Sequence, residues 1–106
     1  MSKIKICKLS QLIDKGYIKR WIDELNDEII LFRNENKIYI KSSICPHFGG
    51  PISYEKNKNY LFCYWHGLKF GLDGKCLNQK SFKPCLNNYK HELKNKFIYL
   101  IKNENS

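Results

Sequence analysis

The sequence predicts an all-β fold made of short antiparallel strands joined by hairpins, and three observations support this class. Polar and apolar residues alternate with a period of two along residues 3–9 and 37–41, which is typical of strands that bury one face. β-Branched and aromatic runs at 28–32 and 97–101 indicate buried strands. Asparagine-rich segments at 34–36 and at Asn95 predict tight turns between neighbouring strands.

The length of the chain indicates one domain. Its 106 residues suit a single core, because domains usually run to roughly 100–150 residues. We therefore expect one unit over residues 1–106. Hydrophobic residues make up 42% of the chain and aromatic residues 14%, which argues against disorder.

Three finer expectations concern individual elements. Ser10 is expected to cap a single helical turn that runs through Lys15 and ends at Gly16. Trp21 is expected in the core. Residues 91–93 are expected to form the strand that precedes Asn95.

Charge and cysteine content point to the environment of the chain. Nineteen Lys and Arg against ten Asp and Glu give a net charge of +9, which favours acidic partners. The longest aliphatic run, residues 29–32, is far shorter than the ~20 residues of a membrane span. Five cysteines, an odd number, suggest metal ligands and thiols more than a disulfide framework. These features predict a cytoplasmic protein that makes no membrane contact.

Two short motifs carry the chemistry. The first is Cys-Pro-His-Phe-Gly-Gly-Pro from Cys45, and the second is Cys-Tyr-Trp-His-Gly from Cys63. They lie in the stretch 42–84, which holds five of the six glycines and all three prolines, as expected of loops. Two thiolates and two imidazoles, from Cys45, Cys63, His47 and His66, suit an iron-sulfur cluster or zinc better than calcium or magnesium.

Together the two motifs resemble those of the Rieske iron-sulfur family. The resemblance implies one [2Fe-2S] cluster per chain, with Cys45 and Cys63 on one iron and His47 and His66 on the other. It also implies a small antiparallel β-sandwich with a cluster-binding subdomain of two ligand loops, at about 43–51 and 62–70. A third, proline-containing loop usually covers the cluster in this family, and residues 81–86 are the best candidate for it.

The family comparison also bears on the reduction potential. High-potential members carry two further cysteines, where this chain has Gly50 and Trp65, and serine and tyrosine hydroxyls, where it has Leu68 and Phe70. Fewer hydrogen bonds to the sulfurs stabilise the reduced cluster less. We therefore expect a potential in the lower half of the Rieske range.

The resemblance implies a one-electron carrier, a Rieske-type ferredoxin between a flavin-containing reductase and a terminal oxygenase or related enzyme. The chain itself is not expected to be an enzyme, because a mononuclear iron site needs two further histidines and only His91 remains. An alternative is a small Rieske subunit held permanently in a reductase or oxygenase complex.

A second alternative is a zinc-ribbon-like module that binds nucleic acid. The charge and the fifteen aromatic residues favour it, but lysines and aromatics are not clustered beside each other as a stacking groove needs. Cys7, Cys76 and Cys85 are expected to be small buried hydrophobes, and His91 a surface or sheet residue. Phe48 and Trp65 are expected to line the cluster edge or to stiffen its loops. Asp73-Gly74 predicts a hairpin turn after a strand that contains Phe70.

Overall fold

The structure is a computed structural model that describes residues 2–44, 51–55, 58–63, 67–73, 75, 77 and 86–102. Within these residues the elements are β1 (Ser2–Lys8), α1 (Leu9–Lys15), β2 (Tyr17–Ile22), the short 3₁₀ helix η1 (Asp23–Leu25), β3 (Asp27–Asn34), β4 (Lys37–Ser42), β5 (Ile52–Tyr54), β6 (Tyr60–Cys63), β7 (Leu68–Gly71), β8 (Asn88–Lys94) and β9 (Phe97–Lys102).

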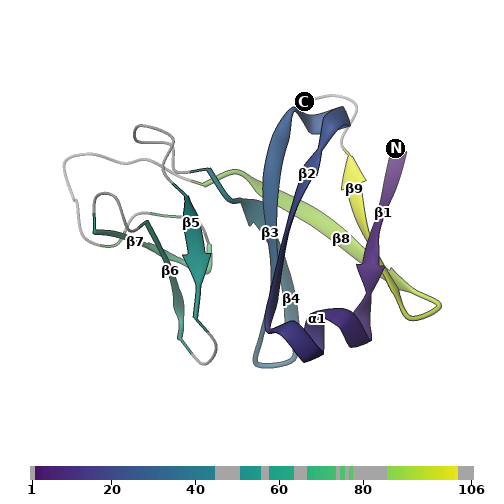
Figure 1. The fold of residues 1–106 in the computed structure, drawn as a ribbon, viewed down its shortest axis with the longest axis horizontal. Coiled ribbons are helices and arrows are strands. Elements are labelled where there is room, and N and C mark those ends of the chain that lie inside the picture. Colours follow the sequence, from purple (N-terminus) through teal and green to yellow (C-terminus); the bar gives the residue numbers. More distant parts are fainter. Residues whose placement is uncertain are drawn as a thin grey trace.

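These strands form two antiparallel sheets (Figure 1). The larger has six strands in the order β1-β9-β8-β4-β3-β2, and the smaller has three in the order β5-β6-β7. The small sheet lies at one end of the molecule, beyond β3 and β4, whereas β1 and β9 lie toward the other end. The predicted all-β antiparallel fold is confirmed.

Strand β3 is buried on both faces, and this organises the interior. Ile29 and Leu31 pack on one side, into a cluster with residues of β1, α1, β2, β4 and β9. Ile30 and Phe32 pack on the other side, into a cluster with the inner face of the small sheet. The expectation of one core is therefore wrong, because alternate residues of one apolar strand point to opposite faces and each face is covered.

The large sheet curls, so that its two edge strands approach each other. The guanidinium of Arg20 on β2 donates a hydrogen bond to the carbonyl of Ile6 on β1. Ile6 and Ile22, one from each of these strands, lie in the same buried cluster as Leu12 of α1. The curl therefore encloses the larger cluster, with α1 between the two edges.

The predicted tight turns are confirmed. Glu35 and Asn36, between β3 and β4, have φ of 50° and 66°, and Asn95 and Lys96, between β8 and β9, have φ of 52° and 70°. Two consecutive residues with positive φ define the type I′ turn, which matches the twist of the flanking strands.

Two predictions about the N-terminal third are wrong in detail. A helix does end at Gly16, but it begins at Leu9, and Gln11 Oε1 accepts the hydrogen bond of the Lys8 amide, 2.9 Å away. Ser10 lies inside the helix and is not its cap. Trp21 is half exposed, because it lies on the edge strand β2 with its side chain away from the core, where its indole N–H donates to Asp23.

Neither of the two helices that the structure describes is long and apolar enough to cross a membrane.

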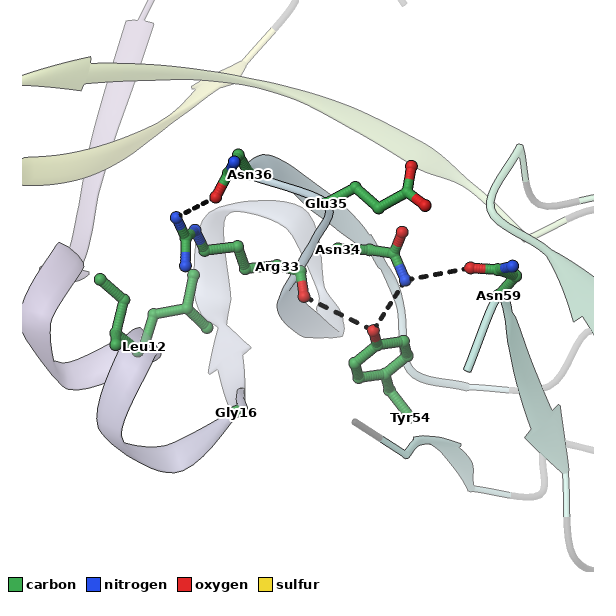
Figure 2. A pocket seen from close by; sticks show the side chains of 9 residues that line it. Leu12, Gly16, Arg33, Asn34, Glu35, Asn36, Tyr54 and Asn59 are labelled. Carbon is green, nitrogen blue, oxygen red and sulfur yellow. Dashed lines mark hydrogen bonds between the residues drawn. The ribbon is translucent and has the colours of Figure 1, made fainter. Parts of the chain in front are cut away.

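A buried amide at the end of β3 ties the small sheet to the large one (Figure 2). Asn34, 7% exposed, donates through Nδ2 to the hydroxyl of Tyr54 and to the carbonyl of Lys58, both at 3.0 Å. Tyr54 in turn donates to the Arg33 carbonyl at 3.5 Å. The lining of a pocket of about 390 Å³ beside α1 includes Arg33, Asn34 and Tyr54. Of its polar residues, Asn34 and Tyr54 form this junction, whereas the side chains of Arg33 and Asn36 bond each other at the turn after β3.

The two clusters on either side of β3 should both contribute to stability. We expect Ile30→Ala and Leu31→Ala each to lower the free energy of unfolding by about 2–5 kcal/mol, because each leaves a cavity in a different cluster. Ile13→Ala is the control, since this side chain is 48% exposed and its loss should cost less than about 1 kcal/mol. Urea unfolding measures all three. A small effect of either core variant would contradict the two-sided burial of β3.

Candidate metal centre

Strand pairing brings the bases of the two predicted ligand loops together. Ile44 and Pro51, which flank the first loop, form an antiparallel bridge. Ile52 pairs with Cys63, and Cys63 pairs with Leu68 across the second loop. Residues that face each other across an antiparallel pair have Cβ atoms roughly 4.5–5.5 Å apart. Both loops therefore leave the small sheet from neighbouring positions.

Of the four predicted ligands, the structure places Cys63. Cys45, His47 and His66 lie outside the described residues. The same holds for Phe48, Trp65, Cys76 and Cys85 and for residues 81–85 of the predicted third loop. Leu86, the last residue of that loop, is 2% exposed and packs in the same cluster as Cys63.

Cys63 lies at the end of β6 with its side chain on the inner face of the small sheet. It is 1% exposed and shares its cluster with Ile52, Leu61 and Phe70. Apolar surroundings of this kind exclude water from a sulfur ligand and lower the local dielectric, which tunes a bound metal. Gly67, at the far end of the second loop, has a φ of 63°, a conformation that suits glycine. Both residues border a pocket of about 370 Å³.

The stem of the first loop is held by a carboxylate on β3. Ser43 is 1% exposed, and its hydroxyl donates to Glu28 Oε1 at 2.5 Å. Its amide donates to the Glu28 carbonyl at 2.7 Å, while its own carbonyl accepts from the Ile52 amide at 2.8 Å. Ser43 therefore joins β3 to β5 two residues before the first motif begins.

A second carboxylate holds the preceding residue. Asp27, 8% exposed, accepts hydrogen bonds from the hydroxyls of Ser42 at 3.0 Å and Tyr89 at 2.6 Å. Burial, followed by the hydrogen bond to Asp27 and its charge, raises the pKa of Tyr89, so this phenol remains a neutral donor. Sequence reasoning missed Asp27 and Glu28, because no motif marks a carboxylate that acts from a distant strand.

A buried lysine connects the large sheet to the turn after β7. Lys41 is 4% exposed, and its ammonium contacts Asn88 Oδ1 and lies 5.5 Å from the centre of the Tyr39 ring. Burial lowers the pKa of Lys41, and the charge of Asp73 opposes that shift. Asn88 also donates to the Asp73 carbonyl at 3.1 Å. These contacts support the small sheet from the side of β4 and β8.

The turn after β7 agrees with the prediction made from Asp73-Gly74. The Gly71 amide donates to the Lys75 carbonyl at 2.8 Å, and Asp73 Oδ1 accepts from the Lys75 amide at 3.0 Å. Gly74 itself lies outside the described residues. Phe70 lies on β7, as predicted, and is fully buried.

Of the two residues set apart from the site, Cys7 is less buried than expected and His91 is a sheet residue, as expected. Cys7 is half-buried against the larger cluster, and burial raises the pKa of its thiol, as expected of a small hydrophobe. His91 lies on β8 and is exposed.

The hydroxyl of Ser43 should contribute measurably to stability. We expect Ser43→Ala to lower the free energy of unfolding by about 1–2 kcal/mol, since it removes a hydrogen bond to a carboxylate from a buried position. Ser53→Ala is the matched control, because Ser53 lies on the outer, half-exposed face of β5. Thermal or urea unfolding compares the two variants. Equal effects would show that the contact to Glu28 does not hold the stem.

The residues present are suited to a cluster shared by two loops. Cys63 is buried directly opposite Ile52. Ile52 follows Pro51, the residue at which the first loop closes. The two thiols and two imidazoles of the motifs are the kinds of donor that a [2Fe-2S] centre with mixed ligation would need.

Comparisons with known proteins agree with this chemistry. The vanillate O-demethylase oxygenase subunit of Pseudomonas sp. (strain HR199 / DSM 7063) is 31% identical over 81 residues, which cover 71% of this chain and 23% of that protein. The chain thus spans less than a quarter of that relative.

Two solved structures share the fold at lower identity. The ferredoxin of carbazole 1,9a-dioxygenase from Nocardioides aromaticivorans IC177 gives a TM-score of 0.79 at 17% identity. The match covers 97% of this chain and 100% of that chain. The quaternary ammonium Rieske monooxygenase CntA gives 0.78 at 24% identity, covering 99% of this chain and 33% of that one.

The family itself is established by sequence. A family model described as the Rieske [2Fe-2S] domain matches residues 2–90, most of the chain. The cofactor that this match implies is a [2Fe-2S] cluster, in agreement with the donor set of the two motifs. The chain belongs to the Rieske [2Fe-2S] domain family.

Proposed function

We propose that this chain is a one-electron carrier of the cytoplasm, which accepts an electron from a flavin-containing reductase and passes it to a terminal oxygenase or related enzyme. The observation that carries the proposal is the pairing of Ile52 with Cys63, because the residues that border the two motif-bearing loops are neighbours in the small sheet. The fold supports it, since a solved ferredoxin of a dioxygenase system shares this fold with a TM-score of 0.79.

In this proposal Cys45 and Cys63 bind one iron and His47 and His66 bind the other. When bound, such a cluster takes up and releases one electron, at potentials of about −150 to +300 mV in this family. The protein supplies the environment. Ile52, Leu61 and Phe70 keep water from the Cys63 side, and the contact between Ser43 and Glu28 holds the stem of the other loop.

A second candidate role is favoured by the vanillate O-demethylase relative, which is named an oxygenase subunit. In that role the same centre would belong permanently to an oxygenase complex. Substrate oxidation would then take place on another part of the complex, because mononuclear iron needs histidine and carboxylate ligands in addition to the four predicted here.

The ligand assignment predicts a defined spectrum. The dithionite-reduced protein should contain two irons and two sulfides per chain and give an electron paramagnetic resonance signal with a mean g below that of all-cysteine clusters. His66→Ala should abolish that signal, whereas His91→Ala, at an exposed position on β8, should leave it unchanged. A colourless protein with a single zinc would contradict the assignment and favour the zinc module.

The potential should respond to a hydroxyl placed where high-potential relatives carry one. We expect a midpoint in the lower half of the family range and a rise of about 20–60 mV in Leu68→Ser, the equivalent of one hydrogen bond of about 0.5–1.5 kcal/mol. Leu77→Ser is the control, because Leu77 is 56% exposed. Protein-film voltammetry measures all three proteins. A wild-type midpoint well above zero would contradict the expectation.

A further inference from the structure

The outer face of β1, β9 and β8 gathers lysines that are far apart in the sequence. Strand pairing places Lys3, Lys5 and Lys8 of β1 and Lys90 and Lys94 of β8 on this face, on either side of β9. All five side chains are exposed. We call these five lysines, together with the residues of β8 and β9 between them, the lysine face.

Between the lysines runs an apolar stripe from β9. The stripe consists of the outward-facing residues of β9, which are Phe97, Tyr99 and Ile101. Each of them lies opposite a lysine of β1, so that paired residues form rows across the strands. Glu92, opposite Tyr99, is the one acidic residue on the face and pairs with Lys3 at 2.5 Å. The hydrogen bond from Lys3 lowers the pKa of Glu92. Five lysines against one glutamate leave a local charge of +4.

A β-bulge in β1 contributes to this arrangement. The register shifts between Lys5 and Cys7, so that Ile6 and Cys7 both pack toward the core and Lys8 returns to the outer face opposite Phe97. Without the bulge, strict alternation would turn Lys8 inward.

Two structural explanations for these lysines cover only part of the set. Lysines on an edge strand discourage pairing with other chains, which accounts for those of β1. Lysine stems also shield apolar surface, and Lys5 Nζ lies 3.7 Å from the centre of the Phe97 ring. Lys90 and Lys94 are on β8, an interior strand of the sheet, and have no ion-pair partner among the residues that the structure describes. They call for another explanation.

The contacts of the aromatic residues decide between two kinds of anionic partner. Single-stranded nucleic acid binds by stacking its bases on open aromatic faces. Here Lys5 covers the Phe97 ring, and Lys8 lies 5.7 Å from its centre. The face therefore offers ammonium groups around a partly covered apolar stripe, which complements carboxylates on a protein surface.

We propose that the lysine face is a docking surface for an acidic protein surface, distinct from the end of the molecule that bears the ligand loops. In Figure 1, β1 and β9 lie at the opposite end from β5, β6 and β7, along a long axis of 42 Å. Electron transfer needs close approach to the metal centre. A partner bound to the lysine face would leave the ligand loops, at the other end of the molecule, accessible for that approach. Only the identity of that partner as a redox enzyme rests on the proposed function.

The test is a binding measurement that involves no electron transfer. Poly-L-glutamate is the probe, and the proteins compared are wild type, Lys90→Glu/Lys94→Glu and the control Lys37→Glu/Lys58→Glu. All four lysines are exposed, and each double variant changes the net charge equally, by −4, from +9 to +5. We expect the first variant to bind at least tenfold more weakly and with a smaller salt dependence, and the control to change less than threefold.

Equal weakening of both variants would overturn the proposal, because binding would then follow net charge alone. Tighter binding of wild type to oligo(dT) than to poly-L-glutamate at physiological salt, lost in Lys90→Glu/Lys94→Glu, would also overturn it in favour of nucleic acid. The visible spectrum and midpoint potential of the face variant should equal those of wild type. Altered values would show that the substitution disturbs the fold, and Lys90→Gln/Lys94→Gln then repeats the comparison.

Discussion

The register between β5 and β6 is the constraint on which the metal centre depends. A slip of one residue in a strand moves every side chain to the other face of the sheet. In the observed register Leu61 and Cys63 point inward and Phe62 lies on the outer face. A slip would expose Leu61, which has no exposed surface, so the apolar cluster itself holds Cys63 in place. The position of the ligand is thus a consequence of hydrophobic packing.

The larger sheet serves as the foundation of this arrangement through β3. The middle of that strand contributes apolar residues to both clusters, and its first two residues, Asp27 and Glu28, bind the serines that lead into the first loop. At its far end, Asn34 binds the small sheet through Tyr54. One strand therefore supports the small sheet and the loop stem at separate points, which restricts motion of either loop base relative to the other.

Much of this architecture follows from local patterns in the sequence, and the exceptions have physical reasons. Alternation, β-branched runs and asparagine turns indicate the strands and hairpins, because these signals depend on neighbouring residues. Trp21 is expected in the core, yet it lies on the outer face of β2 and is half exposed, whereas Ile18 and Ile22 of the same strand face the larger cluster. Ser10 is a good cap residue, but a glutamine side chain one residue beyond it accepts the hydrogen bond at that terminus instead. The residues that hold the loop stem come from distant strands, so no spacing rule reveals them.

The lysine face illustrates the same limit for charge. In the sequence its lysines and aromatics stand apart, and only antiparallel pairing interleaves them. In two of its rows, Lys3 with Lys90 and Lys8 with Lys94, a residue of β9 separates the lysines, which places their strands two spacings apart, about 9–10 Å. Like charges directly opposite each other destabilise a sheet, whereas at this separation, close to the Debye length of about 8 Å, their repulsion is largely screened. The sheet can therefore carry a concentrated positive charge at little cost to its stability, while an approaching carboxylate lies close to several ammonium groups at once.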